Sequence, residues 1–403
     1  MRDTFGMGDM SRSSGRVETG PGLLRAPRPG DQLSAFASAR RELWGLGCAR
    51  RVQVPAPWVD NLDVVGDALA AFDGPAEVVA FGALPYDRDS AASFVVPEIT
   101  HVRTADGDRW QVVVGDGEDP DSRPVPDVRA PSEIAVRSLV PAEEWCAAVE
   151  AARGRIRDGE LVKVVLSREI EVTADVDFDA ATLYNRLREV NPAALCFAVD
   201  GFVGASPELL VSRLGETVRA QPMAGTTRRT GHPEVDQRRA GELLASAKNR
   251  TEHQITIDAV HDALLGWCSY LDAEPVPSVV PAGPVQHLAT LVEGHLSSPQ
   301  PSVLELVAAL HPTPAVGGHP TEPALELQRT LEQSPRGRYA GPVGWVDRSG
   351  NGAFAVGIRS VSLEGNRASL HAGVGVVADS DPAAELAETR AKAQALLSTL
   401  VRI

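Results

Sequence analysis

The sequence predicts a mixed α/β (α+β) protein built on antiparallel sheets. From about residue 140 onward, stretches with helical periodicity are interspersed with pairs of neighbouring strand-like stretches, without the strict strand–helix–strand repeat of a parallel sheet. Two strand-like stretches, 352–363 and 367–378, are separated only by the turn Glu-Gly-Asn. No Gly-x-Gly-x-x-Gly motif follows a strand, so a dinucleotide-binding fold is not indicated.

The expected elements follow one another in a regular order after a variable first third. Helices are expected at 141–160, at 179–192 with Asp179 as its cap, at about 233–267 with a break near Lys248, at 302–310, at 323–331 and from Pro382 onward. Strands are expected at 161–172, 195–205, 208–213, 285–296, 352–363 and 367–378.

Composition along the chain divides it into three segments. Residues 1–30 are polar and rich in Gly, Ser, Arg and Pro, and we expect them to be disordered. Residues 31–130 contain short strand-like stretches among turns and end in a stretch dense in Pro and Asp, typical of a linker or a long surface loop. Residues 131–403 carry the regular pattern and every candidate site residue.

Charge and cysteine usage exclude several classes of function. The 403-residue chain is 43% hydrophobic, enough for a large core, and its net charge of −15 disfavours nucleic acid or an anionic membrane as partner. Its start lacks an apolar signal region, and no apolar run approaches the roughly 20 residues that span a bilayer. Four widely spaced cysteines are typical of reduced thiols, so we expect a cytoplasmic protein: Cys48, Cys146, Cys196 and Cys268.

Lys163 interrupts an otherwise apolar strand. Alternation puts it on one face with Leu161 and Val165, and the opposite face is apolar as well, which is typical of a buried strand. Desolvation there would lower the pKa of the lysine and let it act as a base. An edge strand with Lys163 in solvent explains the pattern equally well.

Three further positions carry weaker signals. Glu208, in "GASPELL", fits a turn carboxylate as well as a catalytic acid. The loop 223–229 consists mostly of small residues. It fits an anion-binding loop, with Thr226 and backbone N–H groups as donors, as well as it fits an ordinary turn. Glu252 begins a helix, where acidic residues usually complement the helix dipole. Together with Glu388 it would also offer the oxygen ligands that Mg²⁺ prefers.

The last helix places three charged side chains on one face. Glu385 and Glu388 are three residues apart, and Lys392 follows Glu388 by four, so all three are neighbours on a helix. Such a face is either a solvated stripe with an ion pair or a place where a metal ion and an anion are held side by side.

Small residues near the C-terminus suggest a strand face that leaves room for a ligand. Small side chains alternate over 353–357 before Arg359, and Gly373 and Gly375 recur two apart in the next strand. Glycine is tolerated in strands where a ligand or another backbone approaches closely, and arginine can bind a carboxylate with two hydrogen bonds. The pattern therefore predicts either a carboxylate pocket or tight packing between sheets.

Nine blocks of the sequence, taken together and in order, resemble those of the chorismate-utilising enzymes, and among them most closely the isochorismate synthases. The resemblance is dense from about Glu143 to Leu400 and rests on these blocks: "KVVLSR", "GASPELL", "AGTTR", "KNRTEH", "LHPTPAVGG", "YAGPVGW", "FAVGIRS", "HAGVGVVADSDP" and "ELAETRAK". It implies one large α/β domain with two stacked antiparallel sheets surrounded by helices, in which 31–130 is the N-terminal part and 131–403 the chorismate-binding catalytic part.

The resemblance also implies an activity, the Mg²⁺-dependent conversion of chorismate to isochorismate. In such enzymes the residue at Lys163 activates a water that attacks C2 of the ring, and the residue at Glu208 protonates the departing C4 hydroxyl. The metal ligands carry over to Glu252 and Glu388, with Glu385 bonded through water.

Substrate contacts carry over from the same blocks. Tyr339 and Arg359 match residues that hold the pyruvyl carboxylate, and Gly373 matches a backbone contact. Lys392 would assist with the charge of the ring carboxylate. By the same resemblance, Thr226 and His287 line the site.

Relatives within the family define the alternatives. Anthranilate and aminodeoxychorismate synthases use ammonia from an amidotransferase partner and lack a water-activating lysine, so Lys163 favours water and we expect no amidotransferase subunit. Separately, we expect a monomer. Salicylate synthases share Lys163 and Glu208 but go on to eliminate pyruvate, which makes them the second candidate. A non-catalytic relative that only binds an anionic metabolite would have lost the acid, the base or a metal ligand. Isochorismate itself feeds both siderophore and menaquinone synthesis.

Overall fold

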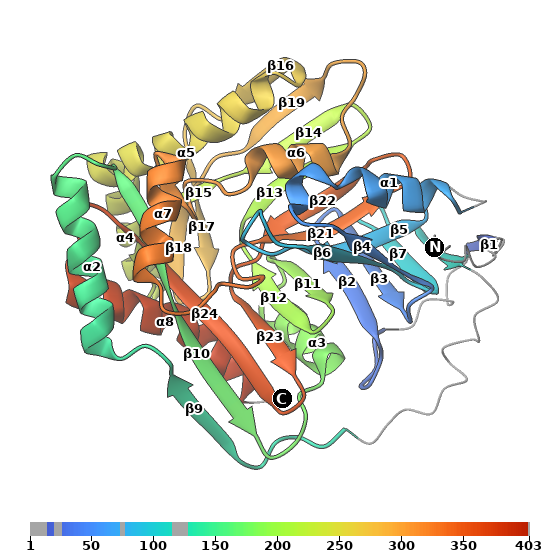
Figure 1. Ribbon diagram of the computed structural model, residues 1–403, viewed down its shortest axis with the longest axis horizontal. Helices are drawn as coiled ribbons and strands as arrows, with labels where there is room; N and C mark the ends of the chain where they lie inside the picture. Colours follow the sequence, from blue (N-terminus) through green and yellow to red (C-terminus); the bar gives the residue numbers. More distant parts are fainter. Residues whose placement is uncertain (1–13, 20–25, 73–76, 115–127, 402–403) are drawn as a thin grey trace, which may run out of the picture.

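The computed structural model describes residues 14–19, 26–72, 77–114 and 128–401, which form two large antiparallel sheets, one small sheet and surrounding helices (Figure 1). This confirms the predicted mixed α/β class. The larger sheet has the strand order β1 (Ser14–Thr19), β8 (Arg109–Val114), β7 (Ile99–Thr104), β3 (Arg41–Leu46), β2 (Leu33–Ala37), β11 (Leu195–Val199), β12 (Phe202–Ser206), β23 (Ser360–Glu364), β24 (Arg367–Val376), β10 (Lys163–Ala174) and β20 (Gly318–His319), with β9 (Ile134–Ser138) also on β10.

The second large sheet and the small sheet are built mostly from later parts of the chain. The second sheet has the order β16 (Cys268–Ala273), β19 (Val292–Leu296), β14 (Thr217–Gln221), β13 (Leu209–Leu214), β22 (Gly352–Val356), β21 (Pro342–Asp347), β5 (Val79–Ala83), β6 (Ala92–Val96) and β4 (Arg50–Val54). The small sheet has the order β15 (Met223–Arg228), β18 (Val285–Ala289) and β17 (Ser278–Ala282). Each of the two large sheets therefore contains strands from before residue 130 and strands from after it.

The two large sheets stack through a shared apolar layer. Phe81 of β5 and Trp345 of β21 pack in one cluster with Phe197 of β11 and Phe202 of β12. Each of these aromatic side chains is almost completely buried, and burying one large apolar side chain contributes about 1.5–3 kcal/mol. This layer fixes the relative position of the sheets, and hence of the strand ends that carry the site.

Helices cover the outer faces of the sheets. α3 (Ala180–Val190) and α8 (Pro382–Leu400) pack on the larger sheet, and α1 (Asp63–Ala70), α5 (Ala247–Leu265) and α6 (Val303–Leu310) pack on the second. α2 (Ala142–Arg157) and α7 (Thr321–Leu331) lie against β10 and β24, and α4 (Pro233–Ala245) against the small sheet (Figure 1). A short 3₁₀ helix spans Trp58–Asp60. Across the described residues, no helix has the length and apolarity needed to cross a membrane.

Local capping explains where two of the predicted helices begin. The Asp179 carboxylate accepts a hydrogen bond from the Thr182 backbone N–H at 2.6 Å, which confirms the predicted cap of α3. The predicted break near Lys248 lies at Ser246, which ends α4 and caps α5 by accepting a bond from the Asn249 N–H.

Four expectations differ from the structure. The segment predicted as one strand at 195–205 forms a hairpin of the two strands β11 and β12. The segment predicted as one strand at 285–296 forms β18 and β19, which belong to different sheets. The segment at 352–363 likewise splits into β22 and β23, so Arg359 lies in the connection between two sheets, with a φ of 54°, and not on a strand face. In the segment 285–296 the period-2 pattern continues across the break, and packing against different sheets decides where the strand ends. In the segment 352–363 the bulky apolar residues change from even positions (Phe354, Val356, Ile358) to odd ones (Val361, Leu363) at the break. Of the segment 1–30 that we expected to be disordered, 14–19 pairs with β8 as strand β1, whereas 1–13 and 20–25 lie outside the described residues.

Candidate active site

A cavity of about 320 Å³ lies beside β10 and β24, where α5, α8 and the small sheet meet them. The sequence-predicted residues come from strands, helices and connections that are far apart in the chain. All eleven line this one cavity: Lys163, Glu208, Thr226, Glu252, His287, Tyr339, Arg359, Gly373, Glu385, Glu388 and Lys392.

Lys163 is the first residue of β10 and is buried, with 3% of its side chain exposed. The alternative of an edge lysine in solvent is therefore wrong. Its Nζ lies 2.7 Å from Oε1 of Glu252 on α5. Gly375 on the adjacent strand makes room for it, because a Cβ at that position would lie 2.8 Å from Lys163 Cε. A side chain at this position in β24 would displace the end of the lysine from its place.

Glu208 lies in the connection between β12 and β13 and is 3% exposed. Burial raises the pKa of its carboxyl group to about 8, although a backbone hydrogen bond from Met223 and the charge of Lys163 act in the opposite direction. The group therefore holds its proton at neutral pH. A buried carboxylic acid in a cavity is suited to giving a proton to a leaving group.

Thr226 and His287 face each other across the paired strands β15 and β18. Thr226 Oγ1 and His287 Nδ1 are 3.1 Å apart, within hydrogen-bonding distance. Burial lowers the pKa of His287 to about 3, and the positive charges of Arg359 and Lys392 act in the same direction. The imidazole is therefore neutral, so this wall of the cavity is polar without adding charge.

The charged face of α8 points into the cavity, and the alternative of a solvated stripe is wrong. Lys392 Nζ lies 2.7 Å from Glu388 Oε1 and donates to the Gly373 carbonyl at 2.8 Å, and only 11% of its side chain is exposed. Burial raises the pKa of Glu385. Burial also acts to raise the pKa of Glu388, but the charge and hydrogen bond of Lys392, together with smaller contributions such as the charge of Arg359, make the net shift downward. The two carboxyl groups of this helix face are thus shifted in opposite directions, Glu385 by burial and Glu388 mainly by its contact with Lys392.

Arg359 is partly buried at the cavity wall and has unused hydrogen-bonding capacity at its buried Nη2. Its Nη2 has no partner among the described residues. A buried guanidinium nitrogen without a partner is rare, and it indicates a place for an anionic ligand group such as a carboxylate. Tyr339, which lines the same cavity, is held by its ring stacked on His371 at 5.2 Å between centroids.

The carboxylates of the cavity fit one type of metal site. In the described part of the chain, no group of three or more His, Cys, Asp or Glu side chains converges closely enough to hold a metal. Glu252 and Glu388 line the cavity from two different helices, with Glu385 one turn before Glu388. One or two carboxylates completed by water is the coordination that Mg²⁺ commonly adopts.

Sequence reasoning missed Lys248, which lines the cavity from the first turn of α5. The signal was present in the composition: of 39 Lys and Arg residues only three are lysine, Lys163, Lys248 and Lys392. All three lie on this cavity.

Comparison with known proteins agrees with the geometry. The family model described as "Chorismate binding enzyme" matches residues 116–401. The chain is 38% identical to the isochorismate synthase DhbC of Bacillus subtilis over 81% of this chain and 82% of that one, and 39% identical to the putative isochorismate synthase MenF of Mycobacterium tuberculosis over 83% and 89%. The crystal structure of a putative 2,3-dihydroxybenzoate-specific isochorismate synthase, DhbC of Bacillus anthracis, is similar with a TM-score of 0.81 at 35% identity, covering 92% of this chain and 96% of that one. Because the match spans most of the sequence and includes every residue of the cavity, the chain belongs to the family of chorismate-binding enzymes.

Proposed function

We propose that the protein is an isochorismate synthase, an isomerase that adds a hydroxyl group from water at C2 of chorismate and expels the one at C4. The observation that carries the proposal is the pair Lys163 and Glu208: a buried amine and a buried acid that holds its proton both face one cavity. A reaction that adds water at one carbon and expels it from another needs one base and one acid. The relatives at 38–39% identity that bear this activity in their names support it.

The cavity offers separate partners for the two carboxylates of chorismate. Arg359, with its unpaired Nη2, and Tyr339 bind the pyruvyl carboxylate. Lys392, held between Glu388 and the Gly373 carbonyl, stabilises the ring carboxylate. Two fixed anchors orient the ring, and orientation of this kind supplies a large part of the rate enhancement of an enzyme.

The proton transfers follow from the two buried groups. Lys163 removes a proton from a water as that water attacks C2. The ring double bonds shift, and the C4 hydroxyl leaves as water with the proton of Glu208. The overall composition is unchanged, as an isomerisation requires. Glu252 accepts a hydrogen bond from Lys163 at 2.7 Å and so orients the amine.

Mg²⁺ is the metal that the carboxylates of the cavity fit, with Glu252 and Glu388 as its holders and Glu385 bonded through water. When bound, it would neutralise the ring carboxylate of the substrate. We expect dialysis against EDTA to abolish turnover and added Mg²⁺ to restore it, with mock-dialysed protein as the control. Full turnover after chelation would refute the metal-binding roles of these glutamates.

Product analysis tests the proposed function directly. Purified protein is incubated with chorismate and Mg²⁺, and the products are separated and identified by mass. We expect isochorismate in equilibrium with chorismate. Salicylate together with pyruvate would make the protein a salicylate synthase with the same site. Absence of any product, also with ammonia supplied, would overturn the proposal in favour of a protein that only binds an anionic metabolite.

A further inference from the structure

The strand that carries Lys163 has a gap in the pairing along one edge. β10 pairs with β24 on one side from Val164 to Thr173. On the other side, β20 pairs only with Lys163 and Val164, and pairing with β9 covers Ile170 to Ala174. Within the described residues, no strand pairs with 165–169 on that side. At the two ends of this stretch single backbone bonds remain: the Val165 N–H donates to the Gly317 carbonyl at 2.9 Å, and the Glu169 carbonyl accepts from the Leu139 N–H at 3.0 Å. Between them, the Val165 carbonyl and the Ser167 N–H need other partners.

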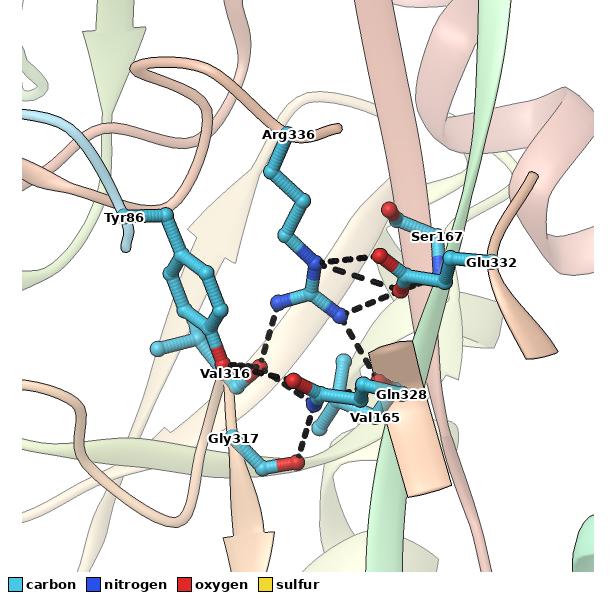
Figure 2. Close-up of polar contacts among 8 residues, drawn as sticks. All are labelled: Tyr86, Val165, Ser167, Val316, Gly317, Gln328, Glu332 and Arg336. Atoms are coloured by element: carbon cyan, nitrogen blue, oxygen red, sulfur yellow. Dashed lines mark hydrogen bonds and ion pairs between the residues drawn. The ribbon is translucent and has the colours of Figure 1, made fainter. Parts of the chain in front are cut away.

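Side chains from α7 and from the loop after it fill this gap (Figure 2). The Val165 carbonyl accepts hydrogen bonds from Gln328 Nε2 and from Arg336 Nη2, both at 2.8 Å. The Ser167 N–H donates to Glu332 Oε1 at 2.8 Å. We call Gln328, Glu332 and Arg336 the β10 bridge, because they take the place of a neighbouring strand.

The β10 bridge also holds the loop that faces β10. Gln328 Nε2 donates to the Gly317 carbonyl at 2.6 Å, and Arg336 Nη1 donates to the Val316 carbonyl at 2.8 Å. The Tyr86 hydroxyl donates to Gln328 Oε1 at 2.9 Å and so fixes the orientation of the amide (Figure 2). Val316 and Val165 both line the cavity. Two walls of the cavity are thus tied to each other.

The charges of the β10 bridge are buried, which needs an explanation. The side chains of Arg336 and Glu332 are 3% and 9% exposed, and Arg336 Nη2 lies 2.6 Å from Glu332 Oε1. A buried ion pair contributes little net stability, because desolvation offsets the attraction. Every hydrogen bond that the Arg336 guanidinium makes ends either on Glu332 or on a carbonyl of a cavity wall. The arrangement therefore serves to fix the position of the two cavity walls relative to each other more than to stabilise the fold.

We propose that the β10 bridge positions Lys163 for the reaction, by holding residues 165–167 of β10 against the loop at Val316. None of the three bridge residues lines the cavity, so they act through β10 and not on the substrate. The inference rests on the proposed function, since it assigns to Lys163 the base of that reaction.

Two substitutions at one position test the proposal. Glu332→Ala removes the acceptor of the Ser167 N–H and the partner of Arg336, and we expect kcat to fall on the order of 10²-fold with little change in KM, the effect of a misplaced catalytic group. Glu332→Gln keeps an acceptor for the Ser167 N–H, so its loss is expected to be smaller. If both variants fold, this order of their kcat values distinguishes positioning from a general loss of structure. If Glu332→Ala does not fold, Glu332→Gln alone is expected to show a lowered kcat with little change in KM.

A matched control comes from a buried carboxylate elsewhere in the same sheet. Glu42 on β3 is 5% exposed and forms ion pairs with Arg103 and, at 2.5 Å, with Arg188. Glu42→Gln is expected to lower the Tm while kcat stays unchanged. If it lowers kcat as much as a Glu332 variant of equal Tm, the effect is one of stability and the proposal is overturned.

Hydrogen exchange gives a readout that does not depend on turnover. In Glu332→Ala, or in Glu332→Gln if the alanine variant does not fold, backbone amides of 163–168 are expected to exchange faster than in the wild type, whereas Glu42→Gln leaves them unchanged. Unchanged exchange in this segment would overturn the positioning role. If the wild type forms no isochorismate, the proposed function fails, and the exchange result still decides whether the bridge holds β10.

Discussion

Lys163→Ala is expected to lose nearly all turnover and to retain binding of chorismate. The variant lacks the base that removes the proton from the attacking water, and removal of such a group typically costs on the order of 10²–10⁴-fold in rate. The anchors for both carboxylates, Arg359 and Lys392, stay in place. The measurements are kcat from isochorismate formation and the Kd of chorismate by calorimetry.

A control for this variant lies on the surface. Arg238 forms an i,i+4 pair with Glu242 on α4, and both side chains are 68% exposed. Arg238→Ala also removes one positive charge, and it should leave kcat and Kd unchanged. If Lys163→Ala turns over at close to the wild-type rate, another group is the base and the proposed mechanism is wrong.

Glu208→Gln is expected to reduce kcat by a similar factor, because the amide keeps the shape of the acid but cannot donate a carboxylic proton. In the wild type the pKa of Glu208 is about 8, so kcat should fall as the pH rises through that value. The residual rate of the variant should lack this decline. A wild-type profile that stays flat up to about pH 9 would exclude Glu208 as the acid.

The ionisation of Glu208 also affects folding, with a sign that can be checked. Its pKa in the folded protein is raised above that of an exposed carboxyl group, about 4.3, so the protonated form stabilises the fold below that pH. This contribution is lost as the pH rises through about 8. Because glutamine does not titrate, the Tm of Glu208→Gln should improve relative to the wild type between about pH 5 and pH 9. A difference in Tm that is independent of pH would contradict the assigned pKa.

The sequence predicted the helices well because their ends are local. Asp179 and Ser246 cap helices through bonds to residues three positions away, and such signals are visible in a single stretch. The change of sheet at Thr290 was not predictable, since the alternation of side chains continues through it. At 357–360 the apolar positions change phase, a signal that the expectation of one continuous strand overlooked. Which sheet each half joins depends on strands that are distant in sequence.

The sequence predicted which eleven residues would lie together, but it did not predict the residues that hold β10 from behind. Each of the eleven predicted residues lies in one of the nine blocks, except His287, and all of them reach one cavity. Gln328 and Glu332, by contrast, look like ordinary polar residues in and after an amphipathic helix. Nothing in the sequence shows that β10 is unpaired between Val164 and Ile170 on one edge. That gap gives the bridge its role, and only the assembled sheet reveals it.

The restriction of lysine to the cavity has a practical consequence for chemistry on the protein. Reagents that acylate or alkylate primary amines ignore arginine, so on this chain they react at a terminal amine or at the mouth and walls of the cavity. Lys248 is the exposed one of the three, whereas Lys163 is shielded. Coupling through amines to a sensor surface would therefore block the cavity that the experiment is meant to probe, and attachment through a different side chain or a terminal tag avoids this. The same restriction turns amine labelling into a selective reporter of whether the cavity is filled.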